Sequence, residues 1–125
     1  MTDEQHFQHG LKMLQTMVGE AEAERVREGW RNMWPDLERL ILEFVAGRIW
    51  TRSVVDLKTR SLSTIAALTA LGRTNALELN VRMAAGNGAT KEEIFETMLH
   101  MAPYAGFPAV WDAMMIASRV LNESR

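Results

Sequence analysis

Asn80 is the polar residue whose position points to chemistry most directly. It lies three residues after Leu77 and four before Ala84, so helical spacing places its side chain along an apolar stripe. A buried amide must find hydrogen-bond partners or it destabilises the fold. Its N–H groups can donate to an oxyanion, but an amide cannot transfer a proton near neutral pH. The sequence predicts that Asn80 donates a hydrogen bond to a ligand in a binding site. The alternative is a core Asn whose polar atoms all find partners within the protein.

His100 is the imidazole best placed to act as a general acid, because its ordinary pKa lies near neutrality. Helical phase turns it away from the apolar face of its helix, which predicts a surface or a subunit interface. The alternative is an exposed histidine with no catalytic part. His6 and His9 are predicted to be solvated, and the scattered histidines do not have the short spacing of a metal site. We therefore expect no metal.

Four further residues could bind an anionic, flat ligand. Trp50 and Arg52 are predicted to lie in a connection, where an aromatic wall and a guanidinium would suit such a molecule. The alternative is that Trp50 covers the core and that Arg52 pairs with a nearby carboxylate. Arg60 and Arg82 lie at the edges of the apolar faces of their helices, and either could pair with substrate. Ordinary salt bridges are the alternative for both.

The elements that must position these residues are helical throughout. Thr2 with Gln5, and Thr90 with Glu93, have the spacing of capping boxes. Other helix starts are predicted at Glu20, Pro35, Asp56, Thr74 and Pro108, and helix ends at Gly19, Gly47, Gly72, Gly86–Gly88 and Pro103. Residues 48–55 are predicted to be a non-helical connection. The pattern indicates an all-α, single-domain bundle of about six to seven helices spanning residues 1–125.

Composition narrows the class of protein. The chain has 125 residues, 47% of them apolar, and a formal net charge of −2 without a basic block, so we expect no nucleic-acid partner. The longest apolar runs are too short to span a membrane, and the polar N-terminus predicts no signal peptide, hence a cytoplasmic protein. There are no cysteines, which rules out disulfides and thiol nucleophiles. Small residues on helix surfaces and several methionines would suit subunit contacts.

Three stretches of the sequence, in this order, resemble the carboxymuconolactone decarboxylase family. They are GRIWTR (47–52), KTRSLSTIAALTALGR (58–73) and NVRMAAGNGATKEEIFETMLHMAPYAGFPA (80–109), and the resemblance covers about residues 44–117. It implies the all-α fold of alkylhydroperoxidase-D-like proteins, and a homo-oligomer that is commonly built from trimers. We therefore expect a trimer or a hexamer.

One branch of that family is redox-active and uses a Glu, a Cys-x-x-Cys and a His. Placing its pattern on this chain puts Ser61 in the Glu position, Arg73 and Ala76 in the Cys positions, and Asn80 in the His position. None of these residues matches. Because a peroxidase of this kind needs a thiolate, the sequence excludes thiol peroxidase activity.

The decarboxylase branch fits GRIWTR and YAGFPA better. It implies cofactor-free loss of CO2 from 4-carboxymuconolactone, or from a related small anionic lactone or ring acid, in the breakdown of aromatic compounds. Trp50, Arg52, Arg60 and Arg82 would hold substrate, Asn80 would stabilise the oxyanion and His100 would donate the proton. The family pattern has a His where this chain has Asn80. The alternative is therefore a homologue that does not decarboxylate, and instead binds an anionic metabolite or serves as an accessory scaffold.

Overall fold

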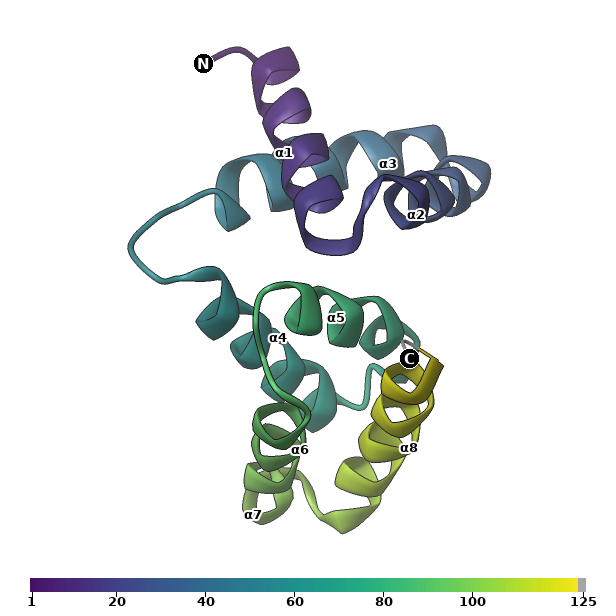
Figure 1. Ribbon diagram of the computed structural model, residues 1–125. Coiled ribbons are helices and arrows are strands. Elements are labelled where there is room, and N and C mark those ends of the chain that lie inside the picture. Colours follow the sequence, from purple (N-terminus) through teal and green to yellow (C-terminus); the bar gives the residue numbers. More distant parts are fainter. Residues whose placement is uncertain (124–125) are drawn as a thin grey trace. The chain divides into compact units, whose positions relative to one another are not determined.

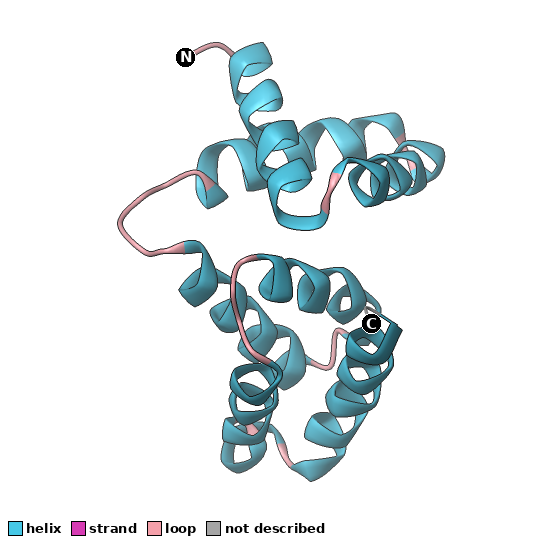
Figure 2. Ribbon diagram, viewed as in Figure 1, coloured by secondary structure: helices cyan, strands magenta, loops and turns pink. Residues whose placement is uncertain are grey.

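The computed structural model describes residues 1–123, and the regular structure within them is entirely helical (Figure 2). This confirms the all-α prediction. Among the described residues, no helix has the length and apolar character needed to cross a membrane. Because α3 runs directly into η1 and α7 is a single turn, these residues form seven helices of substantial length, in line with the six to seven predicted.

The chain divides into two compact units, each with its own core. Met1–Val55 contains α1 (Asp3–Val18), α2 (Glu20–Met33), α3 (Pro35–Leu40) and the π-helix η1 (Ile41–Trp50). The second unit starts at Asp56 and contains α4 (Leu57–Leu71), α5 (Thr74–Gly86), α6 (Lys91–His100), α7 (Ala102–Ala105) and α8 (Phe107–Glu123), as labelled in Figure 1. One domain over the whole chain stays a prediction.

Most predicted helix ends are confirmed. Both capping boxes form, and the side chain of Asp56 accepts a hydrogen bond of 2.7 Å from the backbone N–H of Thr59. Gly72 closes α4 with a φ of +70°, a left-handed conformation that favours glycine. Local side-chain chemistry thus sets the boundaries of these helices.

The predicted stop at Gly47 and the predicted connection from residue 48 are wrong, because η1 continues through Gly47 to Trp50. Gly47 serves instead as a contact point between helices. A Cβ there would lie 2.2 Å from the carbonyl oxygen of His6 in α1, so only a residue without a side chain fits. The helix ends where the Thr51 hydroxyl donates to the Gly47 carbonyl at 2.7 Å. The connection is limited to residues 51–56.

The core of the second unit fills the space between α4, α5, α6 and α8. Its fully buried members include Ile65, Leu77, Val81, Ile94 and Met98, with Val110, Ala113, Ala117 and Val120 contributed by α8. Leu77 and Ala84, the apolar residues on either side of Asn80 in the predicted stripe, are both fully buried. This packing fixes the helices that carry four of the six candidate site residues.

The capping box of α6 gives a first test of this local chemistry. We expect Thr90→Ala to lower the free energy of unfolding by about 1 kcal/mol, because the hydroxyl satisfies the Glu93 N–H at 3.1 Å. The measurement is urea unfolding followed by circular dichroism. Thr97→Ala is the matched control, since its hydroxyl only donates to the Glu93 carbonyl within the same helix at 2.7 Å. Equal losses in both variants would contradict a capping role for Thr90.

Candidate active site

Asn80 lies on α5 and is half-buried, as its place along the apolar stripe predicted. Its Nδ2 donates a hydrogen bond of 2.8 Å to the Ala76 carbonyl, one turn earlier in the same helix. An amide nitrogen carries two N–H groups, and within residues 1–123 the structure gives the second one no acceptor. Asn80 is therefore anchored to its own helix through one donor and retains another for a ligand.

His100 is the last residue of α6 and is exposed, as predicted. Its ring lies 5.9 Å from the Tyr104 ring, between centroids, at an interplanar angle of 57°. It lines an open groove of about 490 Å³ between α4 and α6, together with Leu62, Ser63, Ala66, Glu96, Thr97 and Met101. These lining residues include a carboxylate and no arginine or lysine, so they repel an anionic ligand. His100 can act on such a ligand only if other residues hold its negative charges.

Arg82 forms the ion pairs that were its alternative role. Its guanidinium lies 2.9 Å from a carboxylate oxygen of Glu78 and 3.2 Å from one of Glu123. Arg119 lies 3.8 Å and 3.7 Å from carboxylate oxygens of the same two residues. Two arginines and two glutamates leave this cluster without net charge. A substrate carboxylate would have to displace Glu78 or Glu123 to reach Arg82.

Arg60 lies on α4 and is half-buried, next to the buried Ser61. Helices α4 and α5 pack against each other, so Arg60 and Asn80 belong to neighbouring elements of one core. Asn80 and Arg82 are two residues apart on α5 and therefore do not face the same way. The second unit thus contains a half-buried cation and an amide on adjacent helices, with His100 on α6.

Trp50 and Arg52 belong to the first unit. Trp50 is the final residue of η1 and is 8% exposed, so its predicted place in a connection is wrong while its buried alternative holds. Arg52 lies in the connection, as predicted, and is exposed. The helix end at Trp50 places the two residues on either side of the boundary between helix and connection.

The sequence interpretation missed a polar contact between α4 and the end of α5. Ser61 is 1% exposed, and its hydroxyl oxygen accepts a hydrogen bond of 2.9 Å from Nδ2 of Asn87. In the sequence analysis Ser61 is an unmatched position of the redox pattern, and residues 86–88 are a predicted helix end. The available signal was spacing, because Ser61 lies one helical turn before the core residue Ile65. The pair places two uncharged polar groups inside the second unit.

Comparison of the sequence with known proteins identifies a family and several relatives. The model of the carboxymuconolactone decarboxylase family matches residues 35–119, more than half of the chain. A 4-carboxymuconolactone decarboxylase of Acinetobacter baylyi is 38% identical over 123 residues, which cover 98% of this chain and 92% of the relative. A nitrosuccinic acid decarboxylase of Metarhizium robertsii is 34% identical, covering 97% of this chain and 87% of the relative.

A third relative is an uncharacterised 15.0 kDa protein of Paracoccus denitrificans. It is 40% identical over 91 residues, covering 71% of this chain and 68% of the relative. The match to the family model and the near-complete coverage of the first two relatives lead to one assignment. The chain belongs to the carboxymuconolactone decarboxylase family.

Proposed function

We propose that the protein is a cofactor-free carboxy-lyase acting on a small dicarboxylic acid, with 4-carboxymuconolactone or a close relative as its substrate. The observation that carries this proposal is the 38% identity to a 4-carboxymuconolactone decarboxylase, which extends over almost the whole of both chains. A second relative that is also named as a decarboxylase supports the same reaction type. The absence of cysteine removes the thiol chemistry of the redox branch.

The substrates named for these two relatives share one chemical property. In 4-carboxymuconolactone the departing carboxylate is attached to a carbon that is conjugated through a C=C bond to the lactone carbonyl. In nitrosuccinate it is attached to the carbon that bears the nitro group. When the C–C bond to CO2 breaks, its electron pair moves onto an oxygen of the lactone or nitro group, and a proton then adds to carbon. Both acids carry a second carboxylate, which an arginine can hold in place.

This reaction assigns each candidate residue a task. The free N–H of Asn80 would stabilise the oxygen that gains charge, since donors oriented in advance lower the barrier for such a step. Arg60 would hold the anionic ring, and Arg82 would contribute by exchanging one of its glutamate partners. For Trp50 and Arg52, which belong to the first unit, a part in substrate binding stays a prediction. His100 or a water molecule would supply the proton. These roles extend the family assignment to individual side chains.

The proposal includes assembly and location. We expect a homo-oligomer, a trimer or a hexamer, in the cytoplasm. Support for assembly comes from large apolar side chains that are exposed on the isolated chain, among them Trp111 and Met115.

A second candidate function has one specific observation in its favour. One Asn80 donor is bound to the backbone and Arg82 is bound to two glutamates, which is also what a homologue without decarboxylase activity would show. Such a protein would bind an anionic metabolite or act as an accessory subunit. The turnover experiment below separates the two functions.

We expect the purified protein to consume 4-carboxymuconolactone with stoichiometric release of CO2, and Asn80→His to change the rate by at least about tenfold because it adds a group able to transfer a proton. The measurements are the loss of substrate absorbance and the CO2 evolved. Nitrosuccinate is the second substrate, and succinate, which lacks the electron-accepting group, is the control. His100→Gln is tested alongside to locate the proton donor.

Release of CO2 from either activated acid, but not from succinate, would support the lyase. Tight binding of these acids without CO2 release would support the second function. An inactive protein whose Asn80→His variant gains turnover would locate the loss of the parent activity at residue 80.

A further inference from the structure

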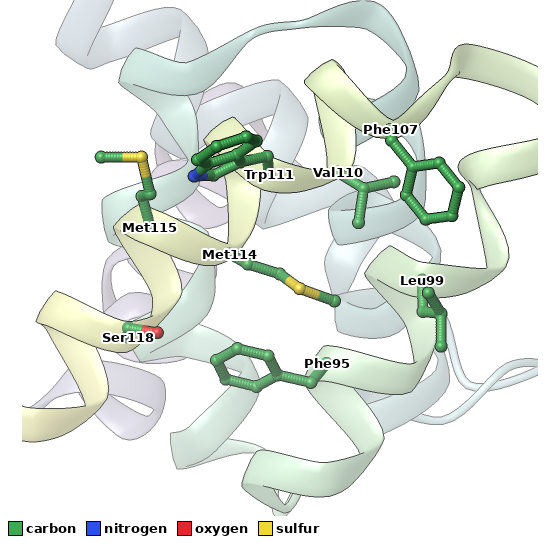
Figure 3. A pocket seen from close by; sticks show the side chains of 8 residues that line it. All are labelled: Phe95, Leu99, Phe107, Val110, Trp111, Met114, Met115 and Ser118. Atoms are coloured by element: carbon green, nitrogen blue, oxygen red, sulfur yellow. The ribbon is translucent and has the colours of Figure 1, made fainter.

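An apolar groove lies between α6 and α8, and none of the candidate site residues lines it. This α6–α8 groove has a volume of about 660 Å³ and is lined by Phe95 and Leu99 of α6 and by Phe107, Val110, Trp111, Met114, Met115 and Ser118 of α8. Figure 3 shows Met114 pointing from α8 toward Phe95 and Leu99 across the groove. None of the lining residues carries a charge. The groove is therefore a different kind of surface from the polar groove at His100.

The rim of the α6–α8 groove exposes large apolar side chains in a regular order. Phe107, Trp111 and Met115 follow one another at intervals of four residues, so they form one stripe along α8, and Leu99 adds to it from α6. All four are exposed on the isolated chain, Trp111 by 69% and Met115 by 62%. An apolar stripe of this length in contact with water marks a surface that another molecule covers.

The chemistry of the groove narrows the choice of that molecule. An anionic substrate is disfavoured, because a carboxylate would lose its hydration without gaining a cation. A membrane surface is disfavoured as well, because Asp112 lies next to Trp111 within the stripe and the groove is lined by none of the lysines and arginines that attract anionic lipids. We propose that the α6–α8 groove binds the same groove of a second copy of this chain, about a two-fold axis. This inference specifies the homo-oligomer of the proposed function and rests on that part of it.

The exposed apolar area of the stripe is about what contact with a second copy of the chain requires. Aromatic side chains bury roughly 150–250 Å² each, so Phe107 and Trp111, each about two-thirds exposed, offer roughly 200–340 Å². Leu99 and Met115 raise the total to roughly 350–500 Å². A standard interface buries about 800 Å² per partner, of which somewhat more than half is apolar. The four side chains alone therefore supply about the apolar area that one side of a stable dimer needs.

The groove and the side chains that project beside it belong to the same face of the second unit. The projecting side chains Trp111 and Met115 lie on the same helix as the residues that line the hollow, so one face carries both projection and cavity. In a two-fold contact the same patch meets itself, and the projecting residue of each copy enters the hollow of the other. Tryptophan is also one of the residue types that are enriched at the energetic centres of interfaces. A trimer of such dimers would give a hexamer.

The test is the molar mass of the full chain in solution, by light scattering and sedimentation equilibrium at micromolar concentration. We expect the double variant Trp111→Glu with Met115→Glu to have half the mass of the wild type, because two carboxylates would face each other across the axis. The matched control is Trp34→Glu with Met33→Glu, since these residues are 65% and 68% exposed and lie outside the groove. The control should keep the wild-type mass. Circular dichroism checks that both proteins are folded.

A second measurement uses the absence of cysteine in the chain. Met115→Cys should be joined into a covalent dimer by a short bismaleimide, whereas Met33→Cys should not. The proposal is overturned by a monomeric wild type, by a folded groove variant of unchanged mass, or by equal loss of mass in the control. Cross-linking at residue 33 but not at residue 115 would also overturn it. Since none of these readouts depends on turnover, an inactive protein leaves this test unaffected.

Discussion

Replacing Gly10 by Ala should destabilise the first unit by about 3 kcal/mol or more, because α1 and η1 touch through their backbones at this point. A Cβ on Gly10 would lie 1.8 Å from the carbonyl oxygen of Leu42 and 2.9 Å from the backbone nitrogen of Gly47. Neither atom belongs to a side chain that could rotate away. The two helices would have to separate, which opens the core around Leu14 and Leu42.

The measurement is urea unfolding followed by tryptophan fluorescence. Three of the four tryptophans, Trp30, Trp34 and Trp50, belong to the first unit, so fluorescence reports mainly on that unit. Gly29→Ala is the matched control, because a Cβ there meets nothing within 4 Å and alanine favours the helix by about 0.5–1 kcal/mol. Should Gly10→Ala prove as stable as Gly29→Ala, the close crossing of α1 and η1 would be refuted.

Features that depend on residues close together in the sequence could be predicted well. Thr2, Asp56 and Thr90 each make the predicted hydrogen bond to a backbone N–H three residues later. Gly19 and Gly72 end their helices with positive φ angles. Such contacts are determined by residues within one short segment and do not depend on the rest of the fold.

Features that depend on residues far apart in the sequence could not be predicted. Gly47 has the low helix propensity of any glycine, so local reasoning placed a helix end there. Its contact with His6, forty-one residues earlier, decides otherwise, and no local pattern contains that contact. The π-type hydrogen bonding of η1 was missed for the same reason, and this moved Trp50 from a connection onto a helix end.

The candidate site shows the same division. The position of Asn80 on the apolar stripe and the exposure of His100 followed from helical phase. The bond from Asn80 to the Ala76 carbonyl is one of several rotamers open to an asparagine in a helix, so it could not be deduced. The contact between Ser61 and Asn87 joins residues twenty-six positions apart, and their identities give no sign of it.

Glu38 is a buried carboxylate of the first unit that pairs with two arginines, and it leads to a second prediction. It is 9% exposed, and its carboxylate accepts hydrogen bonds from Nε of Arg27 at 2.9 Å and from two nitrogens of Arg31 at 2.9 Å and 3.2 Å. The Arg31 guanidinium, aided by Arg27, holds the pKa of Glu38 below its ordinary value and outweighs the burial that would raise it. The folded state therefore favours the charged form of this carboxyl.

Glu38→Gln should lower the free energy of unfolding by about 2 kcal/mol at pH 7, because the amide keeps the shape but loses the charge that both arginines face. The loss stays below that of a fully buried pair, since Arg27 and Arg31 also lie near Glu24. As the native pKa is lowered, the stabilisation is present above the ordinary value of 4.5 and is lost as the pH falls through the native pKa. The difference in unfolding free energy between wild type and variant should therefore shrink when fluorescence-detected urea unfolding is repeated below pH 4.5.

Glu28→Gln, at an exposed position of α2, is the control and should change the free energy of unfolding by less than about 0.5 kcal/mol at either pH. A difference for Glu38→Gln that persists unchanged in acid would contradict the charge-based role, and would leave steric fit as the reason for its cost.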